Sequence, residues 1–383
     1  MPRLAVESQP LALYVHWPWC VRKCPYCDFN SVAAPKALPE ADYLAALVRD
    51  LKVAARRAAG RRVTSVFFGG GTPSLMSASG FARFMDALRG TVTLADDAEI
   101  TLEANPGTVE QERFMAYAAA GVNRFSLGIQ SFNEANLKRL GRIHSVSEAW
   151  KAIEAAHRAT GNFNLDVMYA LPGQTQEELA GEIDDALSAE STHLSFYELT
   201  IEEGTAFGKH PPEDLPDEDA AAALGGLVHE RLRAGGFDHY EISGYARPGR
   251  QCRHNRTYWT FGDYLGIGAG AHGKVTQDGK IIRTVREANP RRYLKAAAQG
   301  CFEAQYREVS PRELPFEFAL NVLRLAEGVP ASRWEETTGE ALSAIAPILE
   351  NLRQRGLLEK DFQRIVTTSM GRRFLSDVQE AFL

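Results

Sequence analysis

Short apolar runs alternate with amphipathic stretches over the first two thirds of the chain. In the amphipathic stretches, such as 42–57 and 146–157, apolar residues recur at spacings of three and four, which predicts helices. The apolar runs are bounded by Gly, Pro, Asn or polar residues, which predicts buried strands. The predicted strands are Leu11–Trp17, Val63–Phe68, Ala98–Glu103, Val122–Gly128, Asn164–Ala170 and His193–Leu199.

Strand–helix alternation indicates an α/β fold with parallel strands joined by right-handed crossovers. An open sheet and a barrel both fit this pattern. We favour a partial (β/α)6 barrel resembling a TIM barrel, because distinctive segments follow the strands, and barrel chemistry lies at the carboxyl ends of strands. These segments are His16–Trp17, Gly69–Pro73, Glu103–Pro106, Gly128–Ser131, Leu171–Gly173 and Leu199–Thr200.

The pattern changes in the last part of the chain. We predict a barrel core at 1–205, a barrel extension at 206–308 with short strands, and a small, mostly helical C-terminal domain at 309–383. The C-terminal segment resembles a winged-helix domain, and we expect a lid or docking domain over the open end of the barrel. Its basic residues are interleaved with acids, so they form no clear stripe for nucleic-acid phosphates.

Composition and charge narrow the function classes. The chain has 383 residues, 45% of them hydrophobic, and a formal net charge of -6, so it lacks an overall cationic field for nucleic acid. No apolar run is long enough to span a membrane, and the first residues lack the apolar core of a signal peptide. Five cysteines, with three in one short loop, suit a reducing cytoplasm and a metal site better than a disulfide framework.

The three clustered cysteines have the spacing Cys20-x3-Cys24-x2-Cys27. Three thiolates in one loop can hold three irons of a [4Fe–4S] cluster and leave the fourth iron open to another ligand. A structural zinc site normally takes four ligands, and Cys252 and Cys301 lie far away in the sequence. Three buried structural cysteines are the other alternative, which the close spacing in a proline-containing loop disfavours.

This loop resembles the signature of the radical S-adenosylmethionine (SAM) superfamily, in which an aromatic residue, here Tyr26, precedes the third cysteine. The resemblance covers about residues 11–205 and implies a partial or full (β/α) barrel whose open iron binds SAM. The run Gly69–Pro73 resembles the motif that contacts the SAM amino group in the oxygen-independent coproporphyrinogen III oxidase family. Glycines there let the backbone approach a ligand closely, although a plain tight turn would also use them.

Further positions match that family, where the corresponding residues surround SAM. Carboxylates and an amide can receive ribose hydroxyls or an ammonium group, and an arginine can pair with the SAM carboxylate. The simpler alternatives are solvated strand ends or helix caps for the carboxylates and a surface position for the arginine. The residues assigned to SAM by this resemblance are Tyr14, Tyr26, Gly70, Gly71, Thr72, Glu103, Gln130, Arg142 and Asp166.

Two departures separate the chain from the decarboxylating oxidases of that family. The oxidases carry a further cysteine two positions after the third, where this chain has Phe29. The motif HNxxYW at 254–259 instead resembles the heme-chaperone branch of the family, and this resemblance implies heme binding. The alternatives are a helix cap for the His-Asn pair and core positions for the Tyr-Trp pair.

The residues of this motif have chemistry that suits heme. His254 or Cys252 could ligate the iron, and the sequence does not rank them. Aromatic rings offer flat apolar area for a porphyrin face, and nearby arginines could pair with the propionates. The heme assignments are His254, Asn255, Tyr258 and Trp259, with Arg247, Arg250, Arg253 and Arg256 around them.

These features predict a heme chaperone that binds heme and a SAM-liganded [4Fe–4S] cluster and delivers heme to acceptor proteins such as membrane respiratory enzymes. The alternative is a radical SAM enzyme acting on porphyrinogens, by oxidative decarboxylation of coproporphyrinogen III, or a related methyltransferase; no catalytic residue is assigned. We expect heme and membrane-associated heme acceptors as partners, and no nucleic acid. A heme-linked homodimer stays open. We expect a cytoplasmic location, with peripheral membrane contact left open.

Overall fold

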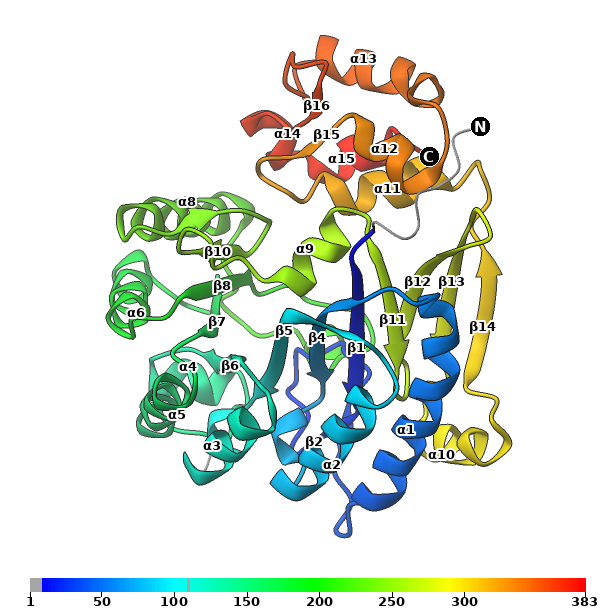
Figure 1. The fold of residues 1–383 in the computed structure, drawn as a ribbon. Helices are drawn as coiled ribbons and strands as arrows, with labels where there is room; N and C mark the ends of the chain where they lie inside the picture. Colours follow the sequence, from blue (N-terminus) through cyan, green and yellow to red (C-terminus); the bar gives the residue numbers. More distant parts are fainter. Residues whose placement is uncertain (1–8, 109–110) are drawn as a thin grey trace.

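A curved sheet of parallel strands with helices on its outer side forms the centre of the molecule (Figure 1). The computed structural model describes residues 9–108 and 111–383. The parallel strands are β1 (Leu11–Trp17), β4 (Val63–Gly70), β5 (Leu94–Ala104), β6 (Arg124–Gln130), β7 (Phe163–Tyr169) and β8 (His193–Glu198). The helices between or after them are α1 (Glu40–Ala55), α2 (Ala78–Arg89), α3 (Gln111–Ala120), α4 (Glu134–Arg139), α5 (Val146–Ala159), α6 (Gln176–Ser188), α7 (Ala206–Lys209) and α8 (Glu218–Ala234).

The strand order confirms the predicted α/β fold with a partial barrel. In the described residues the order is β14-β13-β12-β11-β1-β4-β5-β6-β7-β8-β10-β9, so the sheet has two edges and does not close on itself. The capping box before α5 is present, with Ser145 and Glu148 bonding each other's backbone. The strand predicted to begin at Ala98 begins four residues earlier, since β5 starts at Leu94. Its first residues include polar side chains, which hide the strand pattern in the sequence.

The last strands of the barrel are replaced by an extension that joins β1. β11 (Asp263–Ile267) pairs with β1 in parallel, and an antiparallel ribbon follows. Buried ion pairs hold it in place: Asp263 bonds Arg61 at 2.7 Å and Lys274 at 2.9 Å. The remaining elements are β12 (His272–Gln277), β13 (Lys280–Arg286), α10 (Pro290–Gln299) and β14 (Glu303–Glu308), with β9 (Asp238–His239) and β10 (Gly244–Ala246) at the opposite edge.

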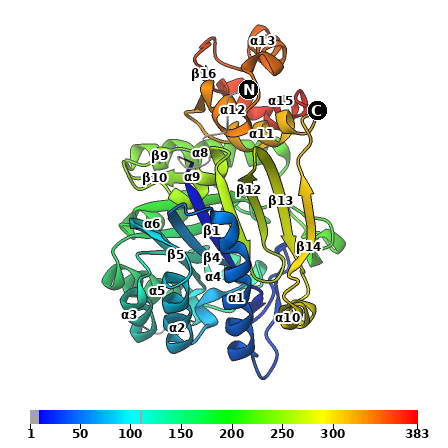
Figure 2. The ribbon, with the colours of Figure 1, turned by 45° about the vertical axis from the view of Figure 1, so that its right-hand side comes forward.

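The C-terminal helices surround a second apolar core that includes Phe318, Trp334 and Leu352. They lie above the end of the sheet at which β1 begins (Figures 1 and 2). Their position is therefore opposite the cysteine loop, and the expectation of a lid over that end of the barrel was wrong. The elements are α11 (Leu314–Val322), β15 (Val329–Pro330), α12 (Ser332–Thr338), α13 (Ala346–Gln354), β16 (Arg364–Ile365), α14 (Ser369–Arg373) and α15 (Leu375–Glu380).

The helices of the described residues are all too short or too polar to cross a bilayer.

Candidate functional site

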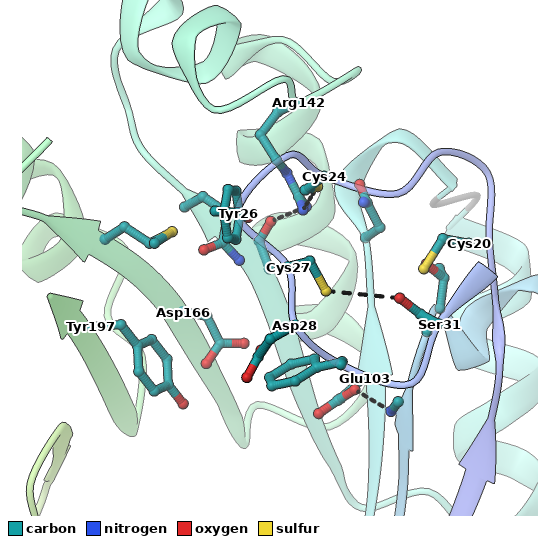
Figure 3. Close-up of a pocket in the computed structure, with 18 of the residues that line it drawn as sticks. Cys20, Cys24, Tyr26, Cys27, Asp28, Ser31, Glu103, Arg142, Asp166 and Tyr197 are labelled. Carbon is teal, nitrogen blue, oxygen red and sulfur yellow. Dashed lines mark hydrogen bonds between the residues drawn. The ribbon is translucent and has the colours of Figure 1, made fainter. Parts of the chain in front are cut away.

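The cysteine loop is closed at its base by two short strands. β2 (Trp19–Cys20) pairs in parallel with β3 (Val32–Ala33), so the intervening residues form a compact loop. Within it the Cys27 N–H donates to the Cys24 carbonyl at 3.2 Å. All three thiols are partly exposed and line one cavity, as Figure 3 shows. The motif therefore places three sulfur atoms around a common space.

Further hydrogen bonds fix the loop. The Lys23 ammonium group donates to the carbonyls of Phe29 and Ser31 at 2.9 and 3.1 Å, which ties the two sides of the loop together. The Asn30 side-chain amide donates to the Ala269 carbonyl at 2.9 Å, which ties the loop to the end of β11. The loop is thus held by its own cation and by the barrel extension.

The glycines at the end of β4 make room for neighbouring parts of the protein. A Cβ atom on Gly70, which has φ +112°, would lie 2.4 Å from the His16 ring, and one on Gly71 would lie 2.6 Å from the Trp19 carbonyl oxygen. His16 Nε2 donates in turn to the Asn30 carbonyl at 2.8 Å. Packing within the protein thus requires both glycines; they also line the cavity beside the cysteine loop, and the approach of their backbone to a ligand stays a prediction. These glycines let β1 and the start of the cysteine loop pack against β4.

A cavity of about 330 Å³ lies between the cysteine loop and the carboxyl ends of the strands. Tyr14 is the one residue assigned to SAM that does not line it; Tyr14 stands in the middle of β1 and faces a deeper chamber. The predicted residues that the structure brings together here are Cys20, Cys24, Tyr26, Cys27, Gly70, Gly71, Thr72, Glu103, Gln130, Arg142 and Asp166. Figure 3 labels the three cysteines, Tyr26, Glu103, Arg142 and Asp166.

Two carboxyl groups, Glu103 on β5 and Asp166 on β7, face this cavity. Glu103 accepts the Gly70 N–H at 3.1 Å, and Asp166 accepts from Ser126 Oγ at 3.1 Å and from the Asn164 amide at 2.8 Å. Burial, and then the nearby Asp166, raises the pKa of Glu103 to about 8. Burial also raises the pKa of Asp166. Two desolvated carboxyl groups in one cavity favour a cationic ligand, which would stabilise their charged forms. They are neither solvated strand ends nor helix caps.

Arg142 connects the cysteine loop to the cavity. Its guanidinium donates to Cys24 Sγ at 3.3 Å and to the Gly128 carbonyl at 2.8 Å. Its Nε is buried without a hydrogen-bond partner among the described residues. The alternative of a surface cation therefore does not hold. Gln130 lines the same cavity with a backbone φ of +69°, an unusual conformation for a residue with a side chain, and such residues are often found at functional sites.

This set of donors fits a [4Fe–4S] cluster with SAM. Three thiols in one loop match three cluster irons, and the cavity beside them supplies carboxylate, amide and guanidinium groups for the polar groups of SAM. Within residues 9–108 and 111–383, no group of three His, Cys, Asp or Glu side chains is arranged to hold a single metal ion. A cubane needs no such convergence, because each thiolate binds a different iron.

The HNxxYW motif lies on a short helix, α9 (Arg253–Trp259), in which His254 and Thr257 are buried. The Glu99 carboxylate accepts the N–H groups of Arg253 and His254 at 3.0 and 3.4 Å, so β5 supplies the cap of this helix. His254 is 1% exposed, and its two ring nitrogens are hydrogen-bonded to Ser65 at 3.2 Å and Tyr258 at 2.7 Å. Burial lowers the pKa of His254 to about 3, so the ring is neutral.

The rest of the motif does not form an open face for heme either. The Arg324 guanidinium lies 4.4 Å above the Trp259 ring, which packs against the C-terminal core. Cys252 is buried beside Glu99, and burial raises the pKa of its thiol to about 12. Three of the arginines expected near the propionates are engaged elsewhere: Arg247 with Phe237, Arg253 with Asp97 and Arg256 with Glu327.

Beneath the first cavity lies a second chamber of about 180 Å³, lined by Tyr14, His254, Asn255 and Tyr258 among others. Glu103, Ser126, Asp166 and Tyr197 line both spaces. The two spaces therefore share part of their walls, and the HNxxY side of α9 faces the barrel interior.

Comparison with known proteins identifies the family. Residues 14–186 match the radical SAM superfamily, and residues 309–374 match the HemN C-terminal domain. The heme chaperone HemW of Escherichia coli is 47% identical over 380 residues, which cover 99% of each chain. The chain belongs to the HemW family. The heme chaperone HemW of Haemophilus influenzae is 43% identical over 390 residues, covering 100% of this chain and 99% of that one.

The fold of this HemW-family chain is also that of a solved radical SAM enzyme. Coproporphyrinogen III oxidase (HemN) from Escherichia coli superposes with a TM-score of 0.83, covering 99% of this chain and 91% of that one. At 22% sequence identity, this likeness shows the shared fold alone.

Several residues of this HemW-family site were missed from the sequence. They are polar side chains inside the barrel, and they alternate along the strands: Arg124 and Ser126 on β6, Asn164 on β7, two residues before the predicted Asp166, and His193, Ser195 and Tyr197 on β8. Alternation of period two places these residues on one face of each strand. The alternation is visible in the sequence, but polar residues within an apolar strand do not by themselves indicate a site.

Proposed function

We propose that this chain is a heme chaperone that carries one [4Fe–4S] cluster, binds SAM and delivers heme to acceptor proteins such as membrane respiratory enzymes. The observation that carries the proposal is the single cavity in which the three loop cysteines face Glu103, Gln130, Arg142 and Asp166. Near-full-length identity to proteins named heme chaperones supports the heme part. Phe29, in place of a fourth cysteine, argues against decarboxylation of coproporphyrinogen III.

Cys20, Cys24 and Cys27 would hold the cluster, which when bound supplies one electron for reductive cleavage of the SAM sulfonium. The protein's part is to orient SAM. Glu103 and Asp166 are placed to receive the ammonium group and the ribose hydroxyls, and Arg142 to receive the carboxylate. Because Arg142 also bonds Cys24 Sγ, it would couple SAM binding to the state of the cluster.

We propose that part of the heme enters the barrel interior. His254, Asn255 and Tyr258 line the chamber, whereas Trp259 packs outside it. The chamber, about 180 Å³, is smaller than the roughly 300–1,000 Å³ of typical ligand pockets, so we place only a side arm of the porphyrin there. Axial coordination by His254 would require release of its bond to Ser65 or Tyr258. We therefore propose His254 as a chamber wall.

The test is a heme titration of the anaerobically reconstituted protein, followed at the Soret band. We expect stoichiometric binding of heme by the wild type. His254→Ala should bind heme at least about tenfold more weakly, which corresponds to a loss of about 1.4 kcal/mol in binding free energy. His157→Ala is the matched control, because His157 is a half-exposed histidine on α5. If the Soret band of His254→Ala stays at the wild-type position, His254 is part of the chamber wall. If the variant loses the spectrum of an iron–imidazole complex, His254 is an axial ligand of the heme iron. Absence of heme binding in the wild type, together with SAM-dependent conversion of coproporphyrinogen III, would replace the proposal with the oxidase.

A further inference from the structure

One buried cation inside the barrel lacks a partner. Arg124, on β6, is 2% exposed and lines the chamber beneath the first cavity. In the part of the chain that the structure describes, its Nε is buried without a hydrogen-bond partner, and no carboxylate lies within ion-pair distance of its guanidinium. Buried charged groups are normally paired and hydrogen-bonded, because removal of a charge from water is costly.

The surroundings of Arg124 do not supply that partner. His193 and His254 face the same chamber, and burial lowers the pKa of both rings, so they are neutral. Asp166 is turned to Ser126 and Asn164, and Glu99 is used by the backbone of α9. These two carboxylates act on Arg124 only from a distance. The guanidinium is therefore held charged and open toward the chamber.

We infer that Arg124 is an anion-binding residue and that the chamber takes a carboxylate group. A guanidinium recognises a carboxylate through two parallel hydrogen bonds, which suits a pocket that is too small for a macrocycle. A carboxylate on a flexible arm can reach Arg124 from the first cavity. The residues it would pass line both the cavity and the chamber: Glu103, Ser126, Asp166 and Tyr197. The two sources of that group are a propionate of heme, which rests on the proposed function, and a free small carboxylate.

The contrast with the exposed arginines supports this assignment. Arg253 and Arg256 lie in the stretch that first suggested propionate binding, yet both are paired with acids of this chain. Arg124 was not singled out in the sequence, yet it is the buried arginine of the chamber. The structure thus moves the carboxylate-binding role from the surface stretch to the barrel interior.

The experiment compares heme with heme dimethyl ester, whose propionates carry no charge. Full-length reconstituted protein is titrated with each at the Soret band, for the wild type, Arg124→Gln and Arg124→Lys, with Arg83→Gln as a control at an exposed arginine on α2. We expect the wild type and Arg83→Gln to bind heme at least about tenfold more tightly than the ester, the range of a charge-assisted hydrogen bond. Arg124→Gln is expected to bind heme and ester alike, and Arg124→Lys to restore part of the difference.

A second arm uses acetate and follows thermal unfolding of the same proteins. Stabilisation of the wild type by acetate, lost in Arg124→Gln while heme affinity is unchanged, would assign the chamber to a free carboxylate. Equal responses of the wild type and Arg124→Gln to heme, ester and acetate would overturn the inference. If the wild type binds no heme, the proposed function fails and the acetate arm still decides the chamber. If Arg124→Gln does not fold, the wild type alone decides. Equal affinities of the wild type for heme and for the ester, together with no stabilisation by acetate, would then overturn the inference.

Discussion

The His16 ring occupies the space that a Cβ atom on Gly70 would need, at 2.4 Å from the nearest ring atom. The same ring donates to the Asn30 carbonyl beyond Cys27, and Tyr14 donates to its other nitrogen at 3.0 Å. Burial lowers the pKa of His16 to about 4, so the ring is neutral and can serve both bonds. This contact between β1 and β4 therefore helps to hold the cysteine loop in place.

Substitution of Gly70 by alanine should disturb the loop and the cluster together. The added methyl group must displace His16, and the φ of +112° strains any residue with a side chain. We expect a loss of about 1–3 kcal/mol in the free energy of unfolding, which is typical of overpacking, measured by urea denaturation. Iron and sulfide content after reconstitution should fall with it.

The control for this variant is Gly60→Ala. Gly60 also has a positive φ, +78°, but a Cβ atom there would meet nothing within 4 Å. Its alanine variant should show a backbone cost of about 1–2 kcal/mol and a full complement of cluster. Equal iron content in the two variants would contradict the role of the His16 contact.

Single replacements of Cys20, Cys24 or Cys27 by alanine should each abolish stable cluster assembly, because each thiolate serves one iron. Iron content and the visible absorption of the reconstituted protein measure this. Cys301 is exposed and distant in sequence from the loop, so Cys301→Ala should assemble the cluster normally. An intact cluster in any of the three loop variants would contradict the assignment.

Arg142→Met should weaken SAM binding. The variant removes the guanidinium from the cavity and its bonds to Cys24 Sγ and Gly128. Hydrogen bonds to charged groups contribute about 1.5–3 kcal/mol, so we expect roughly a 10- to 100-fold higher dissociation constant, measured by calorimetry on the reconstituted protein. Arg139→Met removes an arginine of α4 that lies outside the cavity lining and should leave the SAM affinity unchanged. A loss of the same size in both variants would show that the effect is structural.

SAM binding should tighten as pH rises toward 8. Burial raises the pKa of Glu103 to about 8, so in the free protein this carboxyl is protonated below that pH, and its contribution to stability is lost as pH rises through 8. A cationic ligand favours the carboxylate, so binding releases a proton, and the affinity should rise by at least about tenfold between pH 6.5 and 8.5. Glu103→Gln should flatten this dependence. A wild-type affinity independent of pH would contradict a cation at Glu103.

The fold was predictable because its signals are local. All six barrel strands and the cysteine loop follow from runs of apolar residues and from one short motif, and the boundaries of β1 were predicted as observed. The place of the C-terminal helices was not, because it depends on contacts far apart in sequence, such as the bond of the Arg333 guanidinium to the Thr260 carbonyl at 2.7 Å.

The site was predictable where residues match motifs of the family, and it was not predictable where residues only line the barrel interior. Glu103, Gln130 and Asp166 were predicted from such motifs, and they share one cavity. Arg124 and His193 carry the same alternation deeper in the barrel, but a buried polar residue in a strand resembles a core position until its neighbours are known. The motif at 254–259 was recognised in the sequence, but only the structure shows that His254, Asn255 and Tyr258 face the barrel interior.

The transfer of heme tests the central claim most directly. The heme-loaded protein, with its cluster intact and SAM present, is mixed with membrane vesicles that contain a heme-depleted respiratory enzyme, and the activity of that enzyme is followed. We predict that activity returns faster than with the same amount of free heme, and that the Cys24→Ala variant transfers more slowly. Recovery no faster than with free heme would contradict the account.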